Sequence, residues 1–370
     1  MRSLLLAASF PPAVGGVETL LYQTNRRLPE PPLVLAPAPV AAPGIQVRGV
    51  RSTLAARLAY RPLWQLHPSL HYLQAFWQPA LQASATWRPQ AIQAGHVYLA
   101  PLARLLARRL NVPFVVYTYG QEVWRRGRPM GLKLLDARLR GGALRAADRV
   151  LVPGPFTANL LGDWQVHTER LVSVPYGADP RPDAPAPTGM NLLTVARLIE
   201  RKGIDTVIRA MASLPPSVEY RVVGGGPDEA RLRQLAIAQG VAERVHFLGR
   251  LDEPALADEY RRCTIFVLPA RRTATGELEG YGLVYFEAAA WGRPVVAGRS
   301  GGEIDAVVDG ETGVLVDGES VDQLACTIRA LLADPGRLHA LGAAGRQRVE
   351  QTHNWQAAAD VLDATLVELA

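Results

Sequence analysis

Short apolar runs alternate with longer amphipathic stretches along the whole chain, and Pro or Gly bounds most of the apolar runs. This alternation is typical of βαβ units and predicts an α/β protein with parallel sheets. In the first half the predicted strands are residues 4–8, 33–36, 91–94, 114–117, 149–152 and 171–174. In the second half they are residues 191–195, 219–223, 245–247, 265–268, 294–297 and 313–316.

The chain has 370 residues, which suits two domains of roughly 180 residues each. A Pro-rich segment without an apolar period, residues 177–189, is typical of a linker. We therefore predict an N-terminal domain over residues 1–184 and a C-terminal domain over residues 185–354. The last stretch, about 355–370, has an apolar helical face and is expected to pack back on the first domain. Two such domains would face each other across a cleft, because open parallel sheets bind ligands at the carboxyl ends of their strands.

Composition narrows the class of protein. No apolar stretch approaches the roughly 20 residues that a membrane-spanning helix needs, and the first apolar run is too short for a secretory signal, so we expect a cytoplasmic protein. The two cysteines, Cys263 and Cys326, lack the spacing of a zinc site or a disulfide framework. Residues 1–180 carry 20 Lys and Arg against 8 Asp and Glu (+12), whereas residues 181–370 carry 20 against 26 (−6). The basic half would meet an anionic lipid or acidic acceptor, unless the excess of Arg reflects coding bias alone.

Two carboxylates flank a predicted helix start in the second half. The segment Glu279-Gly-Tyr-Gly-Leu-Val-Tyr-Phe-Glu287 follows the strand at 265–268 and a long loop. Glycines at 280 and 282 permit close backbone approach, and the free amides of a helix that begins near Gly282 would attract a phosphate. A spacing of eight residues does not place Glu279 and Glu287 as an ordinary pair on one helix face, so they are suited to address two ends of one ligand.

Two cations follow the first strand of the second domain, in Val195-Ala-Arg197-Leu-Ile-Glu-Arg-Lys202-Gly. Fixed cations stabilise the negative charge that develops on a departing nucleoside diphosphate. The chain contains no Asp-x-Asp, the divalent-metal clamp of many enzymes that use such donors. We therefore expect Arg197 and Lys202 to take the place of a metal, with no cofactor.

The segment from Glu279 to Glu287 resembles the Glu-x7-Glu signature of retaining glycosyltransferases of family 4, which have the GT-B fold of two Rossmann-like domains. This resemblance implies that Glu279 contacts the donor sugar, that Glu287 binds the ribose, and that the amides of Leu283 and Val284 hold the distal phosphate. It also implies that Arg197 and Lys202 bind the diphosphate. Further segments are similar to the family's donor-binding loops, and their residues are Gly15, Gly16, Gly225, Gly249 and Arg250.

One position departs from the family pattern. In Thr118-Tyr119-Gly-Gln121-Glu122, Tyr119 stands where many relatives have a histidine that contacts the sugar. A phenol titrates near pH 10 and is a poor acid or base at neutrality, so the leaving phosphate is expected to collect the acceptor proton itself. Tyr119 remains a catalytic candidate, and His96, Gln121 and Glu122 are candidates for the acceptor side.

The loop 270–277 and the segment 120–124 look most like the GDP-mannose-dependent branch that mannosylates phosphatidylinositol lipids or polysaccharides. We therefore expect a nucleotide-diphosphate sugar donor, a lipid-linked or saccharide acceptor, and no nucleic acid. UDP-glucose or UDP-N-acetylglucosamine is the competing donor, and a non-catalytic sugar-nucleotide binder or a hydrolysing epimerase is the competing function. The aromatic and basic stretch 57–87 either lies on an anionic membrane at its inner face or packs its aromatic side in the core.

Overall fold

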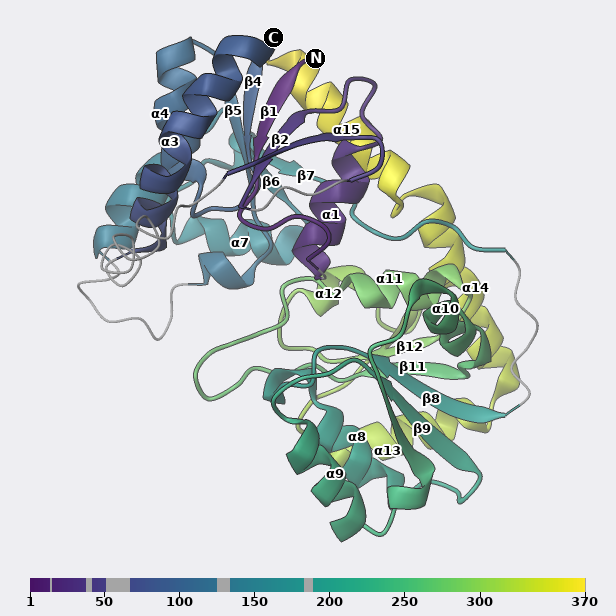
Figure 1. Cartoon of the computed structure of the whole chain (residues 1–370). Helices are drawn as coiled ribbons and strands as arrows, with labels where there is room; N and C mark the ends of the chain where they lie inside the picture. The colour runs from purple at the N-terminus through teal and green to yellow at the C-terminus, as the bar shows by residue number, and fades with distance from the viewer. Residues whose placement is uncertain (14, 38–41, 51–66, 125–133, 183–188, 370) are drawn as a thin grey trace. The chain divides into compact units, whose positions relative to one another are not determined.

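The computed structural model describes residues 1–13, 15–37, 42–50, 67–124, 134–182 and 189–369. The chain forms two compact units. The first unit combines Met1–Tyr176 with Trp355–Ala370, and the second comprises Gly177–Asn354. The domain boundary expected at residues 184 and 185 lies outside the described residues. Helix α15 (Trp355–Glu368) belongs to the first unit, where it contacts α1 (Gly16–Asn25; Figure 1).

The first unit is built on a seven-stranded sheet in which every neighbouring pair is parallel. Its strand order is β3-β2-β1-β4-β5-β6-β7. The strands are β1 (Ser3–Leu6), β2 (Leu33–Ala36), β3 (Gln46–Gly49), β4 (Ala91–Ala94), β5 (Phe114–Tyr117), β6 (Arg149–Val152) and β7 (Leu171–Ser173). Among the described residues, the other α-helices of this unit are α3 (Pro68–Trp87), α4 (Ala100–Leu110), α6 (Gly142–Ala146) and α7 (Pro155–Gly162).

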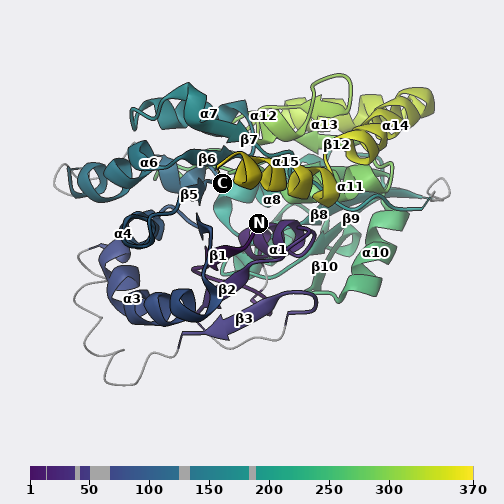
Figure 2. The same ribbon diagram turned by 90° about the horizontal axis from the view of Figure 1, so that it is seen from above.

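The second unit has a six-stranded parallel sheet in the order β10-β9-β8-β11-β12-β13. The strands are β8 (Met190–Val195), β9 (Val218–Val223), β10 (Val245–Gly249), β11 (Ile265–Leu268), β12 (Val295–Ala297) and β13 (Gly313–Leu315). The helices are α8 (Ile204–Met211), α9 (Glu229–Ala238), α10 (Glu253–Arg262), α11 (Leu283–Ala290), α12 (Glu303–Ala306), α13 (Val321–Leu332) and α14 (Pro335–Gln351). Figure 2 shows the helices of both units seen from above.

Both strand orders are those of doubly wound sheets, and the prediction of two Rossmann-like parallel sheets is confirmed. The order reverses between β1 and β4 in the first sheet and between β8 and β11 in the second. Ligands of such sheets bind outside the carboxyl ends of the strands at these reversal points. The carboxyl ends of β8, β9, β10 and β11 and helix α11 carry the second-half candidates, and the loops after β1, β4 and β5 carry those of the first half.

The aromatic stretch that was expected on a membrane or in the core is described from residue 67 onward. In α3, Phe76 is buried, and Tyr72, Trp77 and Trp87 pack against the same core cluster. The Trp87 indole also donates to the carbonyl of Ser3 at 2.9 Å. For these residues the core interpretation is correct. No helix in the described part of the chain is long and apolar enough to cross a membrane.

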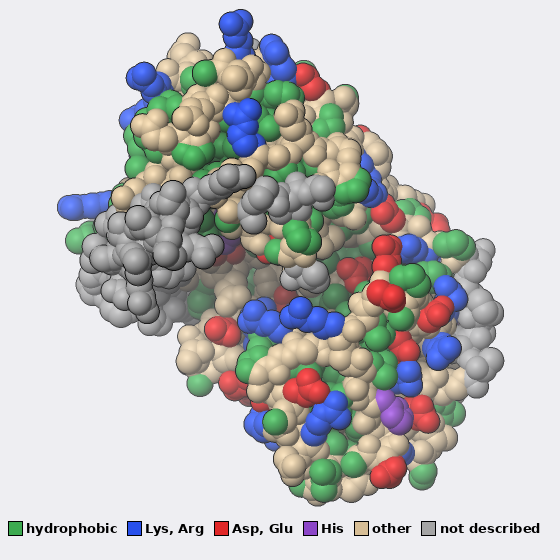
Figure 3. All heavy atoms as spheres, viewed as in Figure 1, with side chains coloured by type: hydrophobic (Ala, Val, Ile, Leu, Met, Phe, Trp, Pro, Cys, Tyr) green, Lys and Arg blue, Asp and Glu red, His purple; other side chains and the backbone are tan. Residues whose placement is uncertain are grey.

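Charged side chains are distributed differently over the two units. In Figure 3 the visible face of the first unit shows mainly Lys and Arg among its charged side chains, whereas that of the second unit mixes both signs. This agrees with the opposite net charges of the two halves of the sequence.

Candidate functional site

Three strand ends of the second sheet are joined by backbone hydrogen bonds. The amide of Leu198 donates to the carbonyl of Gly225 at 3.1 Å, and that of Gly224 donates to Gly249 at 2.7 Å. Gly224 has φ +123°, and a Cβ there would lie 1.9 Å from the carbonyl oxygen of Ala196. The donor-binding candidates Arg197, Gly225, Gly249 and Arg250 therefore lie in adjoining loops at the carboxyl ends of β8, β9 and β10.

Arg197 and Arg250, the two arginines of these adjoining loops, are exposed. Among the described residues the Arg197 side chain has no hydrogen bond or ion pair, and the same holds for Arg250. Two guanidinium groups at the strand ends can therefore reorient toward an anion without breaking a protein contact.

Helix α11 begins where the sequence predicted, with Leu283 as its first residue and Gly282 as its N-cap. Gly282 has φ +87°, a left-handed conformation that favours glycine. A Cβ at this position would come within 2.3 Å of the Tyr285 ring. The first amides of any helix have no intrahelical acceptor, so Gly282, Leu283 and Val284 present N–H groups suited to a phosphate.

Glu279 and Lys202 form a buried ion pair in the second unit, through Oε2 of the glutamate and Nζ of the lysine. Burial raises the pKa of Glu279, but the positive charges of Lys202 and Arg201 more than offset it, so the pKa lies below its usual value. Glu279 is therefore an anion at neutral pH that can accept hydrogen bonds from hydroxyl groups. The structure thus joins two candidates that are 77 residues apart in sequence.

Glu287 lies on the second turn of α11 and accepts a hydrogen bond of 2.7 Å from the Tyr260 hydroxyl. Burial raises the pKa of Glu287, and the bond from Tyr260 offsets this only in part. Tyr260 is itself buried at the end of α10. It fixes the Glu287 carboxylate, and sequence reasoning missed it because nothing in its local pattern marks it as more than a core residue.

A second residue that the sequence did not single out is Glu303, which is fully buried. Its Oε1 accepts from the amides of Ser300 at 2.6 Å and Gly301 at 2.9 Å. The amide of Gly302 in the same turn donates to the carbonyl of Glu279 at 2.9 Å. A Cβ on Gly302 would lie 1.8 Å from the carbonyl oxygen of Gly280. Glu303 therefore holds a glycine turn against the backbone that carries Glu279.

The first unit gathers the acceptor-side candidates at the ends of β4 and β5. Tyr119 is buried, and its hydroxyl donates to the carbonyl of Gly95 at 2.7 Å. The His96 ring lies 6.1 Å from the Tyr119 ring and stacks on Tyr98 with centroids 4.9 Å apart. Burial raises the pKa of Tyr119 well above its ordinary value. Burial also lowers the pKa of His96 to about 4, with a smaller effect from the charge of Arg140. Both rings are therefore neutral at pH 7.

Glu122 is tied to the same place. Its Oε1 accepts from the amide of Tyr119 at 2.6 Å, and Arg140 donates to the Glu122 carbonyl at 2.9 Å. Burial raises the pKa of Glu122. Gln121 precedes it in the short helical turn Gln121–Val123. The glycines at 15 and 16 open α1 elsewhere in this unit, with Gly15 as its N-cap.

In the second unit the candidates lie at the carboxyl ends of the strands and on α11, and in the first unit the acceptor-side candidates lie at the ends of β4 and β5. Within the described ranges no cluster of three or more His, Cys, Asp or Glu side chains is arranged to hold a metal ion. Lys202 contacts Glu279, which precedes α11 by a short turn, and the charges of Lys202 and Arg201 both act on that carboxylate.

Known proteins resemble the chain over almost its full length. A family model described as "Glycosyl transferases group 1" matches residues 181–348, and one described as "Glycosyl transferase 4-like domain" matches residues 15–177. A GDP-mannose-dependent alpha-(1-6)-phosphatidylinositol monomannoside mannosyltransferase of Mycolicibacterium smegmatis is 37% identical over 281 residues, which are 70% of this chain and 71% of the relative. The protein of the same name in Mycobacterium tuberculosis is 30% identical over 405 residues and covers 99% of this chain and 97% of its own.

A solved structure shares the fold. The Anabaena protein HepE in complex with UDP has a TM-score of 0.80 to this chain, with 20% identity and coverage of 100% of both chains. At this identity the likeness concerns the fold alone.

Proposed function

The chain belongs to the group 1 glycosyl transferases, with a glycosyl transferase 4-like first half, and on this premise we propose that it transfers mannose from GDP-mannose to a phosphatidylinositol-type, lipid-linked acceptor. Its relatives with this activity by name are 37% and 30% identical to it. The observation that carries the proposal is the buried Lys202–Glu279 pair, which immediately precedes the amino end of α11 in the strand-end loops of the second unit.

In the proposed donor complex, the amides of Leu283 and Val284 bind the distal phosphate at the positive end of the α11 dipole. Glu279 accepts hydrogen bonds from the sugar hydroxyls, and Glu287 accepts those of the ribose. The loops at Gly225 and Gly249 lie beside the base.

The leaving group of the reaction is GDP, and bond cleavage places additional negative charge on its distal phosphate. The ammonium of Lys202 and the guanidinium of Arg197 stabilise this charge in the transition state more than in the ground state. Such fixed cations supply the electrostatic stabilisation that a divalent metal provides in other transferases, so the proposed mechanism uses no cofactor.

The acceptor hydroxyl must lose a proton as it attacks the anomeric carbon. Tyr119 is a poor base because its pKa is raised and its hydroxyl already donates to Gly95. His96 is neutral at pH 7 and could accept a proton only weakly, given a pKa of about 4. We assign the proton to the departing phosphate oxygen, on the face of the sugar where the acceptor attacks. Configuration is then retained, and Tyr119 and Glu122 orient the acceptor.

A thermal-shift panel with GDP, UDP and ADP and their sugars tests the donor. A ligand at about 100 times its Kd stabilises the protein by roughly 2.7 kcal/mol. We expect the largest shift with GDP and GDP-mannose. A largest shift with UDP would contradict the mannose donor.

Turnover separates an enzyme from a sugar-nucleotide binder. With GDP-mannose, the Glu279→Ala variant should lose both slow donor hydrolysis and transfer to a phosphatidylinositol acceptor, while the wild type performs them. Isomerised GDP-sugar without any acceptor would indicate an epimerase instead. A wild type that binds GDP-mannose but never turns it over would indicate a binder.

The acceptor implies that the enzyme works at the inner face of the cytoplasmic membrane. Support comes from the net charge of +12 over residues 1–180, since anionic lipid attracts a basic surface. The aromatic side chains of α3 pack in the core, so this association rests on charge. Co-sedimentation with anionic vesicles should be strong at low salt and lost at high salt, and absence of binding at low salt would refute it.

A further inference from the structure

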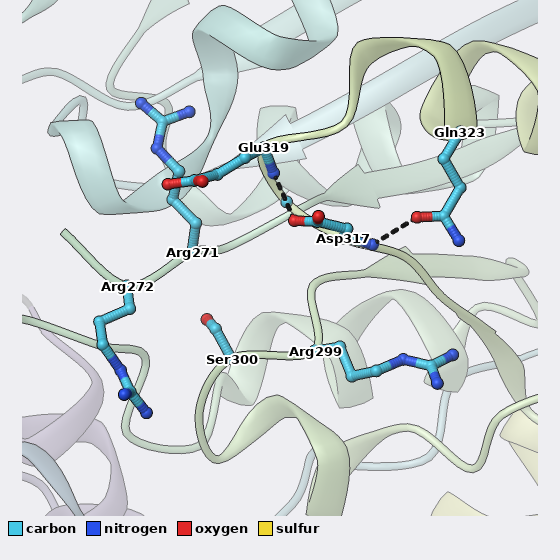
Figure 4. A pocket seen from close by; sticks show the side chains of 8 residues that line it. Arg271, Arg272, Arg299, Ser300, Asp317, Glu319 and Gln323 are labelled. Carbon is cyan, nitrogen blue, oxygen red and sulfur yellow. Dashed lines mark hydrogen bonds between the residues drawn. The ribbon is translucent and has the colours of Figure 1, made fainter.

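A cavity of about 500 Å³ opens in the second unit beside the strand ends of β11, β12 and β13. Figure 4 shows Ser300 and Arg299 on one side of it and Asp317 and Gln323 on the other, with Arg271, Arg272 and Glu319 at the left of the view. No lining residue of this cavity has an aromatic or aliphatic side chain. Cavities of about 300–1,000 Å³ hold small ligands, and this one offers only hydrogen-bonding groups.

The cavity has a rigid wall. Arg271 donates to both carboxylate oxygens of Asp205, at 2.9 and 3.1 Å, and to the Thr206 hydroxyl at 3.0 Å. Burial raises the pKa of Asp205, but its bonds to Arg271 and Arg209 lower the pKa by more than burial raises it, so Asp205 is ionised at neutral pH. Two guanidinium groups thus share one carboxylate in this wall. The rest of the lining carries Arg272 and Arg299 against Asp317 and Glu319, so it offers groups of both signs.

The opposite donors and acceptors are partly committed. Arg299 uses Nη2 to donate to Asp309 at 2.8 Å and to the carbonyl of Leu315 at 3.0 Å. Its other N–H groups have no partner among the described residues. Asp317 accepts the amide of Glu319 at 3.0 Å through Oδ1, and the Gln323 amide oxygen accepts from the amide of Asp317 at 2.8 Å. These bonds orient the second carboxylate oxygen of Asp317 and the amide NH₂ of Gln323 without consuming them.

Two backbone contacts connect the cavity to the donor-binding loops. The amide of Arg271 donates to the carbonyl of Arg201 at 2.8 Å, directly before Lys202. Ser300 begins the glycine turn that holds the backbone of Glu279. The cavity and the Lys202–Glu279 pair therefore lie side by side on the same edge of one sheet.

We propose that this cavity binds a phosphorylated polyol, namely the phosphate and ring hydroxyls of the acceptor headgroup. Arg299 and the wall at Arg271 supply charge-assisted donors for the phosphate. The Ser300 hydroxyl is not counted among them, because it donates to Glu303 at 3.0 Å. Asp317 and Gln323 pair with hydroxyl groups of the ring. A nucleobase fits poorly because nothing in the lining can stack on it. The inference rests on the proposed transferase function and assigns part of acceptor recognition to the donor-binding unit.

The test is isothermal titration calorimetry on the full chain with three probes: myo-inositol 1-phosphate, inorganic phosphate and myo-inositol. GDP is titrated separately. The wild type should bind inositol phosphate more tightly than either of its parts. Arg299→Ala should lower the affinity for inositol phosphate at least about tenfold, because it removes a charge-assisted contact. Asp317→Asn should weaken the binding of inositol phosphate and leave the binding of inorganic phosphate unchanged. The matched control is Arg329→Ala, an exposed arginine of α13 in the same unit, which should change nothing.

GDP affinity should be the same in the wild type and all three variants, which shows that each is folded. Inositol phosphate that does not bind, or binds equally to the wild type and Arg299→Ala, overturns the proposal. Inorganic phosphate that binds as tightly as inositol phosphate overturns the polyol part, since the cavity would then take any phosphate. Failure of GDP to bind the wild type would instead contradict the proposed donor, so the two failures are distinguishable.

Discussion

Replacing Lys202 by Met should destabilise the second unit, because it leaves the Glu279 carboxylate buried without its ammonium partner. Removing one member of a buried ion pair costs about 3–5 kcal/mol. Arg201 remains as the second positive charge that acts on Glu279. We therefore expect a loss near the lower limit, about 3 kcal/mol at pH 7.

The pH dependence should reverse as well. In the wild type the folded pKa of Glu279 lies below the unfolded value of about 4.3, so its stabilisation is complete above that pH and is lost as pH falls through the folded pKa. In Lys202→Met the burial effect dominates, and the folded pKa rises above the unfolded value. The variant should then be least destabilised in acid and lose stability as pH increases through the raised pKa.

Urea denaturation with hydrogen exchange on peptides from β8 and β11 measures this unit specifically. The double variant Lys202→Met/Glu279→Gln should recover most of the loss, since it removes the uncompensated charge. The control Arg329→Met changes an exposed arginine and should stay within about 0.5 kcal/mol of the wild type. A single variant that loses less than about 1 kcal/mol, with no change of slope between pH 4.5 and 7, would refute the reasoning.

Three further changes test other parts of the site. Tyr260→Phe removes the hydroxyl that fixes Glu287, so titration calorimetry should show GDP binding about tenfold weaker and inorganic pyrophosphate, which lacks the ribose, unchanged; equal weakening of both would exclude a ribose role. His96 has a folded pKa of about 4, so between pH 6.5 and 4 the unfolded chain binds a proton that the folded chain does not, and the free energy of unfolding decreases as the pH is lowered through this window. His96→Gln should flatten that part of the stability profile, and an NMR titration with a His96 midpoint near 6.5 would contradict the reasoning. Gly282→Ala should cost more stability than Gly310→Ala, because both glycines have positive φ but only a Cβ at Gly282 meets a ring, whereas nothing lies within 4 Å at Gly310; thermal denaturation with equal losses would show that backbone conformation alone matters.

Most strands could be predicted because buried parallel strands are continuous apolar runs. Leu33–Ala36 and Ile265–Leu268, for example, have the predicted bounds and are buried throughout. The strand that the sequence analysis did not predict is β3, Gln46–Gly49, at the edge of the first sheet. It alternates exposed and half-buried residues, because an edge strand has a neighbour on one side only. Its polar positions therefore gave no apolar run to recognise.

The family of the chain and its transferase class followed from the Glu279–Glu287 motif and are confirmed by the comparisons. The contacts that arrange the site did not follow. Tyr260 reaches Glu287 across 27 residues, and Arg271 reaches Asp205 across 66. Such pairs depend on the strand order of the sheet, which brings the loops together, and no local pattern in one sequence records them. The roles of the individual site residues stay predictions.

The direct contact between Lys202 and Glu279 means that their proposed roles in binding cannot be separated. A lysine that is assigned to the diphosphate also sets the charge and position of the carboxylate that is assigned to the sugar. Loss of Lys202 would therefore weaken sugar recognition, and loss of Glu279 would leave the ammonium free to bind phosphate more strongly. Residues in contact couple by about 0.5–3 kcal/mol, so their effects on GDP-mannose binding should not add. Affinity for GDP itself, which lacks the sugar, should fall with Lys202→Met and hold or rise with Glu279→Gln. Equal losses of GDP affinity in both variants would show that the pair serves only to maintain the fold.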